Sequence, residues 1–456
     1  MIVKLAVIGA GWAGMAAAVE GVARGADVTV FESARTLGGR ARALQVPRDD
    51  GLPLTLDNGQ HILIGAYTGA LALMQRVGID LSQTLLPLPL ALRYPDGSGL
   101  RTPGWATRWP APLDTLAAIT TARGWRWHER LALLRASLRW QRAGFDCAPG
   151  LTVADLCAGL PPRVRHELID PLCVSALNTP AVDASAAVFL RVLRDALFGP
   201  GSAGFNASCL LLPRVDLSRL FPDTAAQWLT AHHGEQYRLR SGTRVGCLRP
   251  QSTGWLLGHE GGEEAFDAVI CATAASPAEK LAEQAADGCE AATATPLRAW
   301  ARTARGLPFT ALTTVYAHAP GARLSAPMLA LRAEPDEQAA PAQFVFDRGQ
   351  LQPRDAQAQG VLAFVVSASQ GERDELQARV LRQAARQLGL NTLRPVQTVV
   401  EKRATFACTP NLVRPPSAMA PGLWAAGDYV QGPYPATLEG AVRSGHAAAA
   451  LATQPP

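Results

Sequence analysis

The chain has few lysines and no long apolar run. Only Lys4, Lys280 and Lys402 are lysines among its 43 basic residues, so arginine carries nearly all of the positive charge. This bias accompanies abundant glycine and proline and is typical of GC-rich coding, so the net charge of +5 gives no reason to expect nucleic-acid binding. No stretch of 18 uncharged apolar residues occurs, and we therefore predict no transmembrane helix.

The eight cysteines show neither a Cys-x-x-Cys pair nor another spacing typical of metal ligands. We therefore predict free thiols of a cytosolic protein and no metal site. Glycines interrupt the apolar start of the chain, which is unlike a cleaved signal peptide. The cysteines are residues 147, 157, 173, 209, 247, 271, 289 and 408.

The first 32 residues predict a dinucleotide-binding βαβ unit. An apolar strand over residues 3–8 runs into Gly9-x-Gly11-x-x-Gly14, a helix of small residues follows, and a second strand ends at Glu32. The glycines permit a tight turn, close approach of the backbone to a pyrophosphate, and close packing of the helix. The N-terminus of the helix offers N–H groups to phosphates, and Glu32 is placed to bind a ribose diol.

Residues 35–40 indicate which dinucleotide is bound. They contain the pair Gly38–Gly39, which lets a second stretch of backbone approach the cofactor, and Arg40, a cation that can neutralise phosphate charge. This pattern resembles the two-dinucleotide-binding signature of flavoproteins of the amine oxidase and phytoene desaturase type. The resemblance implies that the glycine pair lies along the pyrophosphate and flavin of FAD.

The other end of the chain resembles the same flavoproteins. A short apolar strand over residues 423–426 ends at Gly427-Asp428, and a helix of small residues opens after Ala436-Thr437. In that family the Asp accepts a ribityl hydroxyl, and the helix N-terminus points at the pyrimidine edge of the flavin. We predict non-covalent FAD, because no His or Cys stands where attachment could be argued. The predicted cofactor-binding residues are Gly9, Gly11, Trp12, Ala13, Gly14, Glu32, Ser33, Gly38, Gly39, Arg40, Gly59, Val245, Gly427, Asp428, Ala436 and Thr437.

The two terminal motifs predict an α/β fold with a Rossmann-like FAD-binding domain of the amine oxidase type, built from discontinuous segments. A middle segment supplies helical spacing over residues 217–231 and strand-like alternation over 237–272, where Val245 resembles the residue that pairs with the adenine edge. We assign residues 1–70, 206–289 and 401–456 to this domain. Residues 71–205 and 290–400 are predicted to form an α+β substrate domain that faces the membrane.

The stretch LDNGQHILIGAY over residues 56–67 indicates which subgroup of these flavoproteins the chain resembles. Together with CVSALNTP (173–180) and GPYPATLEGAVRSG (432–445), it resembles the squalene-associated, FAD-dependent, desaturase-like proteins of bacterial hopanoid pathways, whose members are hydroxysqualene dehydroxylases. The resemblance implies reductive loss of a hydroxyl group to give squalene and water. Breaking the C–O bond requires protonation of the oxygen, and Asp57, His61 and Tyr67 are the candidates to supply the proton.

Each of these candidates also has a structural interpretation. Asp57 would cap a turn, His61 would hold the flavin loop, and Tyr67 would pack in the core. Asn178 is either a polar group of the pocket or a turn residue, and a turn residue is the better interpretation.

Three other functions fit the same motifs. The first is an oxidative desaturase of a polyprenoid such as phytoene. The second is an amine oxidase, for which Trp424, Tyr429 and Tyr434 would form an aromatic cage near the C-terminal motif. The third is a flavin-bound, non-enzymatic lipid escort. The sequence names no electron donor, because it contains neither a second nucleotide-binding motif nor iron–sulfur ligands.

Residues 101–142 predict how a prenoid lipid substrate is reached. The stretch contains five of the ten tryptophans and eight arginines against two acidic residues. On a helical wheel Arg135, Arg139 and Arg142 fall within roughly 60° of one another, beside three leucines. This pattern favours a peripheral protein at the inner face of the cytoplasmic membrane, although a solvated helix of an arginine-rich protein would look similar.

Overall fold

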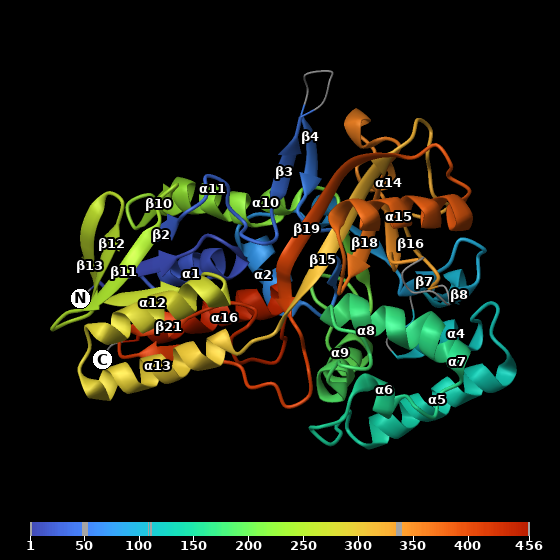
Figure 1. The fold of residues 1–456 in the computed structure, drawn as a ribbon, viewed down its shortest axis with the longest axis horizontal. Coiled ribbons are helices and arrows are strands. Elements are labelled where there is room, and N and C mark those ends of the chain that lie inside the picture. The colour runs from blue at the N-terminus through green and yellow to red at the C-terminus, as the bar shows by residue number, and fades with distance from the viewer. Residues whose placement is uncertain (1, 48–52, 108, 110–111, 334–339, 455–456) are drawn as a thin grey trace.

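The structure is a computed structural model that describes residues 2–47, 53–107, 109, 112–333 and 340–454. Residues 108, 110 and 111 of the predicted membrane-facing stretch lie outside the described residues. So do 1, 48–52, 455 and 456 of the predicted FAD-binding domain and 334–339 of the predicted substrate domain. The elements are arranged along one long axis, and both ends of the chain lie at the same end of it (Figure 1).

A six-stranded sheet combines strands from three distant parts of the chain. Its order is β10-β2-β1-β14-β21-β20, in which the first five strands are parallel and β20 is antiparallel. Leu5 of the central strand faces Val28 on one side and Ala268 on the other. This topology confirms the predicted Rossmann-like fold built from discontinuous segments. The strands are β1 (Lys4–Ile8), β2 (Asp27–Glu32), β10 (Tyr237–Ser241), β14 (Ala268–Cys271), β20 (Ala418–Ala420) and β21 (Leu423–Ala425).

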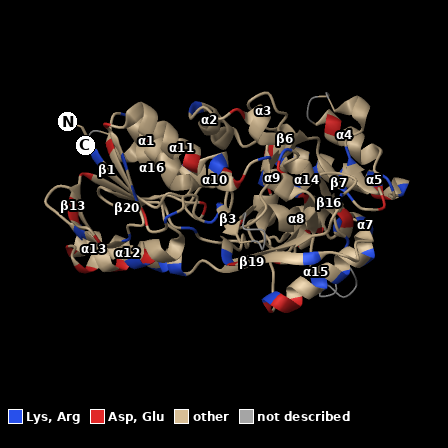
Figure 2. Ribbon diagram, turned by 90° about the horizontal axis from the view of Figure 1, so that it is seen from above, with Lys and Arg blue, Asp and Glu red and all other residues tan. Residues whose placement is uncertain are grey.

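Helices from the two ends of the chain pack on each other over this sheet. Small residues bring α1 (Trp12–Ala23) and α16 (Leu438–Ala452) close together, because a Cβ on Gly445 would overlap the Ala13 carbonyl oxygen. Figure 2 shows these two helices on one side of the sheet and α12 (Ala275–Asp287) and α13 (Ala291–Arg305) on the other. Both faces of the parallel sheet are therefore covered, as its continuous apolar strands require.

A second sheet has five antiparallel strands in the order β16-β17-β18-β15-β19. The helix α15 (Arg373–Leu388) packs its apolar side against this sheet. The long strands β15 and β19 run between the two halves of the molecule (Figure 1). The strands are β15 (Phe309–His318), β16 (Met328–Ala330), β17 (Phe344–Asp347), β18 (Val361–Ser367) and β19 (Arg394–Phe406).

The remaining described strands form smaller sheets, and the remaining helices range from single turns to the long helix α5. The strands are β3 (Ala43–Val46), β4 (Leu54–Asp57), β5 (Leu63–Ile64), β6 (Leu85–Leu88), β7 (Ala91–Arg93), β8 (Gly99–Arg101), β9 (Leu210–Pro213), β11 (Val245–Pro250), β12 (Trp255–His259) and β13 (Gly262–Phe266). The helices are α2 (Thr68–Arg76), α3 (Leu81–Thr84), α4 (Leu113–Thr120), α5 (Trp127–Arg142), α6 (Val153–Leu156), α7 (Pro162–Val164), α8 (Asp170–Leu177), α9 (Ala186–Phe198), α10 (Leu217–Leu220), α11 (Pro222–His233) and α14 (Arg348–Leu351). None of the described helices has both the length and the apolarity needed to span a membrane.

The structure differs from the predicted elements in three places. The single helix predicted over residues 217–231 is two helices, because Pro222 lacks an N–H donor and starts α11 after the non-helical Phe221. The predicted domain boundary after residue 400 falls inside β19. The helix α13, which lies in the predicted substrate domain, packs on α12 and β20 beside the six-stranded sheet.

Candidate functional site

The glycine-rich turn after β1 leaves space beside its backbone. A Cβ on Gly9 would lie 2.7 Å from the Ala272 carbonyl oxygen, and one on Gly14 would overlap the Gly9 oxygen, so the protein itself requires glycine at both positions. Gly11 is different, because a Cβ there would meet its nearest neighbours, Gly38 and Gly39, only at 3.9 Å. Room for a further group therefore remains at Gly11.

The first turn of α1 lies directly after this space. Trp12 and Ala13 begin the helix, which has neither a side-chain cap nor an acidic residue in its first turn. The N–H groups of this turn and the positive end of the helix dipole are therefore available to an anion, as a pyrophosphate requires.

Glu32 holds its carboxylate beside the glycine turn. One oxygen accepts a hydrogen bond from the backbone N–H of Ala10 at 2.8 Å, and the other accepts one from Ala34 at 2.8 Å and from the Ser33 hydroxyl at 3.3 Å. The Glu32 carbonyl accepts the N–H of Thr243, two residues before Val245. The predicted ribose-binding and adenine-binding residues thus lie side by side.

The glycine pair and the C-terminal motif meet through an ion pair. The Gly38 N–H donates to the Ala10 carbonyl at 2.9 Å, which places the pair against the glycine turn. The next residue, Arg40, donates to the Asp428 carboxylate and to the Ala404 carbonyl. Burial acts to lower the pKa of Arg40, but the Asp428 carboxylate, with Glu401 and Tyr429, raises that pKa overall. Two predicted cofactor ligands, 388 residues apart, are therefore partners of each other.

The start of α16 is fixed by its own loop. The Thr437 hydroxyl accepts the Gly440 N–H at 2.9 Å and so caps the helix, while Ala436 adopts a left-handed φ of +57°. A non-glycine residue in this conformation is strained, and such residues cluster at ligand-binding sites. The N–H of Gly427 donates to the Ser444 hydroxyl at 2.8 Å, which ties the predicted ribityl-binding turn to the same helix.

The loop after β4 contains Gly59 and His61. The Nδ1 atom of His61 lies 2.8 Å from the Gly59 carbonyl, which only accepts, so Nδ1 carries the proton. Burial, and then the nearby Arg40, lower the pKa of His61. The imidazole is therefore neutral near pH 7, and its Nε2 atom accepts a proton more readily than it donates one.

Asp57 is buried at the end of β4, where it contacts α10, α14 and β15. One carboxylate oxygen accepts the Leu217 N–H at 2.8 Å, and the other lies 3.4 Å from the guanidinium of Arg348. Its carbonyl accepts the Tyr316 hydroxyl at 2.8 Å. Burial raises the pKa of Asp57 to about 6, although Arg348 acts to lower it. These contacts give Asp57 a structural task, and its role as a proton donor stays a prediction.

Tyr67 has charged and aromatic neighbours of its own. It precedes α2, and burial, followed by the nearby Glu439 and Tyr434, raises the pKa of its phenol. Among the described residues the Tyr67 hydroxyl has no hydrogen-bond partner, and no hydrogen bond joins any two of Asp57, His61 and Tyr67. The described hydrogen bonds therefore do not link the three into a proton relay, and their catalytic roles stay predictions.

Asn178 has a structural role. It ends α8 with a left-handed φ of +46°. Its amide group donates to the hydroxyls of Thr310 and Thr405 and accepts the Ala368 N–H at 2.7 Å. The turn interpretation is therefore supported, and Asn178 fixes α8 to the second sheet.

The aromatic residues near the C-terminal motif do not form a cage. The Tyr434 ring has the guanidinium of Arg443 at 4.8 Å and that of Arg191 at 5.6 Å from its centroid. Tyr429 is buried with its ring centroid 6.5 Å from that of Trp300. Trp424 lies in β21 and packs against the core of the parallel sheet. An amine cation would find the Tyr434 faces already occupied by cations.

The residues present fit a flavin dinucleotide at the glycine turn. A Cβ on Gly11 would meet no atom closer than 3.9 Å, and the first turn of α1 has neither a side-chain cap nor an acidic residue. Gly38 lies against the same turn through its hydrogen bond to Ala10, and so does the Glu32 carboxylate. A pyrophosphate at Gly11 would therefore meet free N–H groups and no carboxylate of the helix start.

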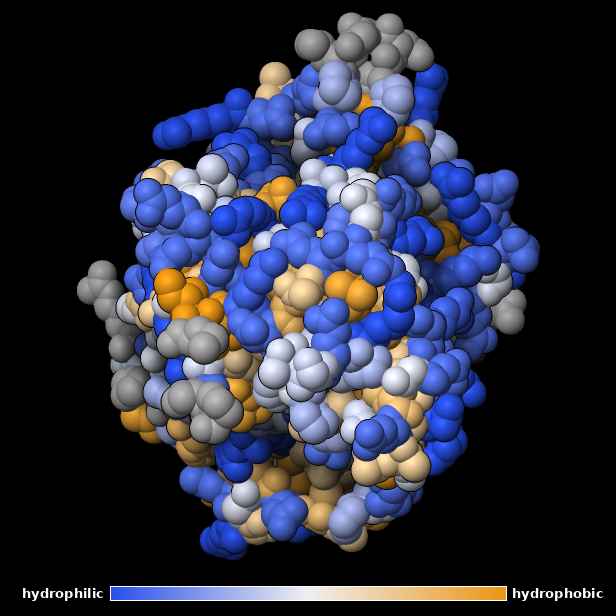
Figure 3. All heavy atoms as spheres, turned by 90° about the vertical axis from the view of Figure 1, so that its left-hand side faces the viewer, coloured by the Kyte–Doolittle hydropathy of each residue, from blue (hydrophilic) through white to orange (hydrophobic). Residues whose placement is uncertain are grey.

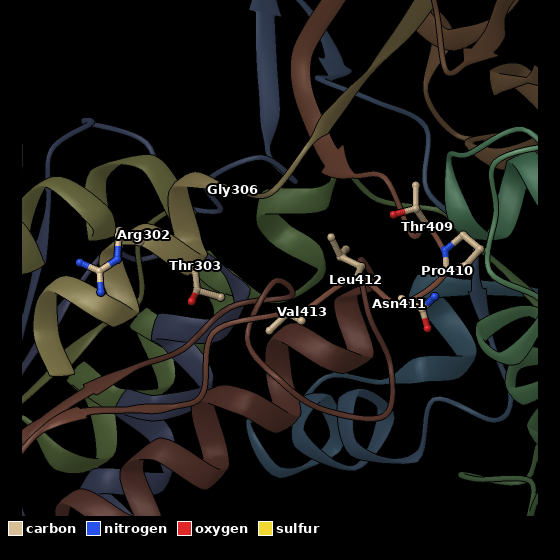
Figure 4. Close-up of a pocket in the computed structure, with 8 residues that line it drawn as sticks. All are labelled: Arg302, Thr303, Gly306, Thr409, Pro410, Asn411, Leu412 and Val413. Atoms are coloured by element: carbon tan, nitrogen blue, oxygen red, sulfur yellow. The ribbon is translucent and has the colours of Figure 1, made fainter. Parts of the chain in front are cut away.

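A surface depression lies elsewhere. It is lined by Arg302, Thr303 and Gly306 of the α13 end and by the loop 409–413 (Figure 4). It contains none of the predicted cofactor-binding or catalytic residues.

The sequence reasoning missed several residues that build the site. Glu439 is fully buried, and its carboxylate accepts the N–H groups of Gly69 and Ala70 at 2.9 and 2.7 Å, so it caps α2 from another helix. Arg348 is 2% exposed and pairs with Asp57. The available signal was an acidic residue in the small-residue helix start TLEG and an Asp-Arg pair directly after the apolar strand FVF.

The comparisons with known proteins cover nearly the whole chain. The family described as "Flavin containing amine oxidoreductase" matches residues 12–453. Hydroxysqualene dehydroxylases of Zymomonas mobilis and Sinorhizobium fredii are 29% and 28% identical, with 98% of this chain and 98% and 97% of theirs covered. A zeta-carotene desaturase of Capsicum annuum is 35% identical, but over only 17% of this chain and 12% of its own.

The solved structures agree on the fold. A putative protoporphyrinogen oxidase from Exiguobacterium sp. 255-15 superposes with a TM-score of 0.66 at 15% identity, covering 99% of this chain and 98% of its own. The predicted flavin cofactor and oxidoreductase activity are confirmed by the family match, which also argues against a non-enzymatic lipid escort. The chain belongs to the flavin containing amine oxidoreductase family.

Proposed function

We propose that the protein is an FAD-dependent hydroxysqualene dehydroxylase. In the reaction a C–O bond of hydroxysqualene breaks and a C–H bond forms at the same carbon. A hydride and a proton are consumed, and squalene and water are the products. The observation that supports this proposal most is the likeness to hydroxysqualene dehydroxylases along almost the full length of both chains. The likeness to a carotene desaturase is confined to a short segment.

The cofactor assignment combines two features. The glycine turn, the uncapped start of α1 and the carboxylate of Glu32 suit the ADP half of a dinucleotide. The family is flavin-containing, and FAD is the flavin that has an ADP half. When bound in its reduced form, FAD supplies a hydride to the carbon that loses its hydroxyl group.

The remaining chemistry requires a proton donor among the chain's own residues. His61 is neutral and protonated at Nδ1, where it already donates to Gly59, and the carboxylate of Asp57 is enclosed by protein groups. Tyr67 carries its proton at neutral pH, as any tyrosine of ordinary or raised pKa does, and its hydroxyl is not engaged by a described residue. Among the three predicted candidates, Tyr67 is therefore the one we place against the leaving hydroxyl group.

An amine substrate is disfavoured by the charges around Tyr434. The guanidinium groups of Arg191 and Arg443 lie over its ring, where a substrate ammonium would have to bind. A hydrocarbon alcohol carries no charge and meets no such repulsion.

The test is single-turnover reduction of the alcohol. The purified protein, loaded with FAD and reduced with dithionite without oxygen, is mixed with hydroxysqualene, and the flavin absorbance and the extracted lipids are followed together. We expect squalene to form in step with return of the oxidised flavin spectrum. Formation of a more unsaturated product from squalene or phytoene with oxidised flavin, and no turnover of hydroxysqualene, would instead support the desaturase alternative.

The proton donor is tested with a matched pair of variants. Tyr67→Phe should slow squalene formation while flavin content is unchanged. Tyr237→Phe removes a buried, unpaired hydroxyl on β10, outside the predicted site, and it should have the rate of the parent. Equal rates for the two variants would remove Tyr67 from the mechanism.

A further inference from the structure

The exposed apolar side chains gather in one part of the chain. Among the described residues, seven of the thirteen large hydrophobic side chains that are exposed lie between residues 105 and 138. The most exposed of these seven are Trp127 at 71% and Trp105 at 61%. A concentration of this kind, as opposed to single scattered residues, indicates an interaction surface.

The helix α5 divides its exposed side into an apolar half and a basic half. Trp127, Leu131 and Leu138 are exposed and recur at the spacing of one helix face. Arg135, Arg139 and Arg142 are exposed on the adjacent face. The opposite face, with Leu133, Ala136 and Trp140, is buried in the core. The exposed apolar residues are therefore not needed to hold α5 in place.

The helix α4 contributes a second apolar surface beside the first. Leu113 and Leu116 are exposed at 47% and 45%, and α4 packs against α5. Arg130 of α5 donates to the carbonyl groups of Thr120 and Ala122 at 2.7 and 2.6 Å, which fixes the end of α4 to α5. The two helices thus form one rigid unit with leucine and tryptophan side chains in solvent.

We propose that α4 and α5 form a docking surface for an anionic lipid bilayer. Trp105, Trp127 and the exposed leucines would enter the headgroup region, where tryptophan is enriched, and Arg135, Arg139 and Arg142 would contact lipid phosphates. In the part of the chain that the structure describes, none of these three arginines has a carboxylate partner within 4 Å. This inference goes beyond the proposed reaction and does not depend on it.

A second copy of the chain fits this surface poorly. A two-fold symmetric contact through α5 would bring its arginines close to the same arginines of the other copy, and the repulsion would be uncompensated. Anionic phosphates supply the complementary charge and lipid acyl chains supply the apolar contact, so a bilayer satisfies both halves of the surface.

The position of the surface permits contact with a flat membrane. Figures 1 and 2 place α4 and α5 at the end of the long axis opposite to the two chain termini. The face at the terminal end, seen in Figure 3, is largely hydrophilic with scattered apolar residues. The end with α4 and α5 can therefore contact a bilayer while the half of the molecule with the six-stranded sheet stays outside it.

The experiment is cosedimentation of the FAD-loaded protein with vesicles. One set of vesicles is phosphatidylcholine alone, and the other contains phosphatidylglycerol as well. We expect binding to the anionic vesicles that is partly weakened by high salt, because salt screens the arginines but not the apolar contact. Tryptophan emission should be quenched by brominated lipid, and less so in Trp127→Phe.

Two variants change the basic and the apolar residues of the surface separately, and each has a control variant. The variant Arg135→Glu/Arg139→Glu/Arg142→Glu should lower the partition coefficient into anionic vesicles by about a hundredfold or more. The variant Trp127→Ser/Leu131→Ser/Leu138→Ser should abolish the salt-resistant binding. The controls change equally exposed residues elsewhere, and they should bind as the parent does: Arg244→Glu/Arg354→Glu/Arg382→Glu and Val182→Ser/Val413→Ser/Leu451→Ser.

Three outcomes would overturn the proposal. The first is a parent protein that binds neither kind of vesicle. The second is loss of binding in the controls equal to that in the α5 variants. The third is a parent oligomer, seen by light scattering, that the α5 variants dissociate while their lipid binding is unchanged. Circular dichroism melting establishes that each variant is folded before it is scored.

Discussion

The buried pair of Asp57 and Arg348 gives the sharpest test of how the end of β4 is joined to α14, beside the five-stranded sheet. Arg348 is 2% exposed and also donates to the Thr55 carbonyl at 3.2 Å and to the Gln352 side chain at 3.1 Å. Arg348→Met keeps much of the side-chain volume but removes the cation. The Asp57 carboxylate would then be buried with no opposite charge beside it.

The loss of folding stability expected in Arg348→Met follows from the burial of the pair. Removing one partner of a buried ion pair typically costs about 3–5 kcal/mol, because the other charge is left uncompensated. The parent pKa of Asp57, about 6, already lies above its ordinary value of 3.8, and this difference corresponds to about 3 kcal/mol. Without Arg348, which acts to lower it, that pKa rises further.

The sign of the pH dependence can be worked out from that pKa. A carboxyl group whose folded pKa is above its unfolded value favours folding most below pH 3.8, and this contribution is lost as pH rises through about 6. In Arg348→Met the pH range over which this contribution is lost extends to higher pH, because the pKa of Asp57 in the folded protein is higher. The variant should therefore lose about 3–5 kcal/mol at pH 8 and clearly less at pH 5.5, where Asp57 takes up a proton.

Urea unfolding of the FAD-loaded protein, followed by circular dichroism at the two pH values, measures these differences. Arg305→Met is the matched control, since Arg305 pairs with Glu279 but is 60% exposed, and we expect a loss within about 1 kcal/mol. Adding Asp57→Asn to Arg348→Met should remove the extra pH dependence. An equal loss of stability at pH 5.5 and pH 8 would refute the assignment of the charge to Asp57.

Three further predictions concern the cofactor site. Gly11→Ala should leave the unfolding of the cofactor-free protein unchanged and weaken FAD binding in a fluorescence titration, whereas Gly14→Ala should fail to give folded protein. Glu32→Ala should weaken FAD binding tenfold or more, since each hydrogen bond to a charged acceptor contributes about 1.5–3 kcal/mol, and unchanged affinity would remove Glu32 from the ribose. Glu439→Gln should lower the stability by about 1–2 kcal/mol in thermal unfolding, while the more exposed Glu283→Gln should not.

The parts of the fold that could be predicted are those with local steric demands. The turn at Gly9 and Gly14 cannot accept a side chain, so the sequence must show glycine there, and the flanking apolar strands follow at fixed distances. The strand β19 escaped prediction because its residues carry mixed charge and all but two of them are exposed or half-buried. The helix α13 escaped because Pro296 lies within it, and proline is usually a sign that a helix has ended.

The site was predictable only where a residue acts through its neighbours in sequence. The cap of α16 by Thr437 depends on Gly440, three residues away, and the pattern is visible in the sequence. The partner of Asp57 is 291 residues away in sequence, and the partner of Arg40 is 388 residues away. No local sequence pattern predicts either of these pairs. Long-range pairs of this kind are decided by the topology of the two sheets.

The pairing of Arg40 with Asp428 bears on how the cofactor contributes to the fold. The predicted flavin-binding segments come from the two ends of the chain. They already contact each other through this ion pair and through the packing of α1 on α16. A dinucleotide bound between the glycine turn and the Gly427-Asp428 turn would contact both ends of the chain at once. FAD binding should therefore stabilise the contacts between the first and the last segments of the chain. Loss of the cofactor should weaken the packing of both segments together.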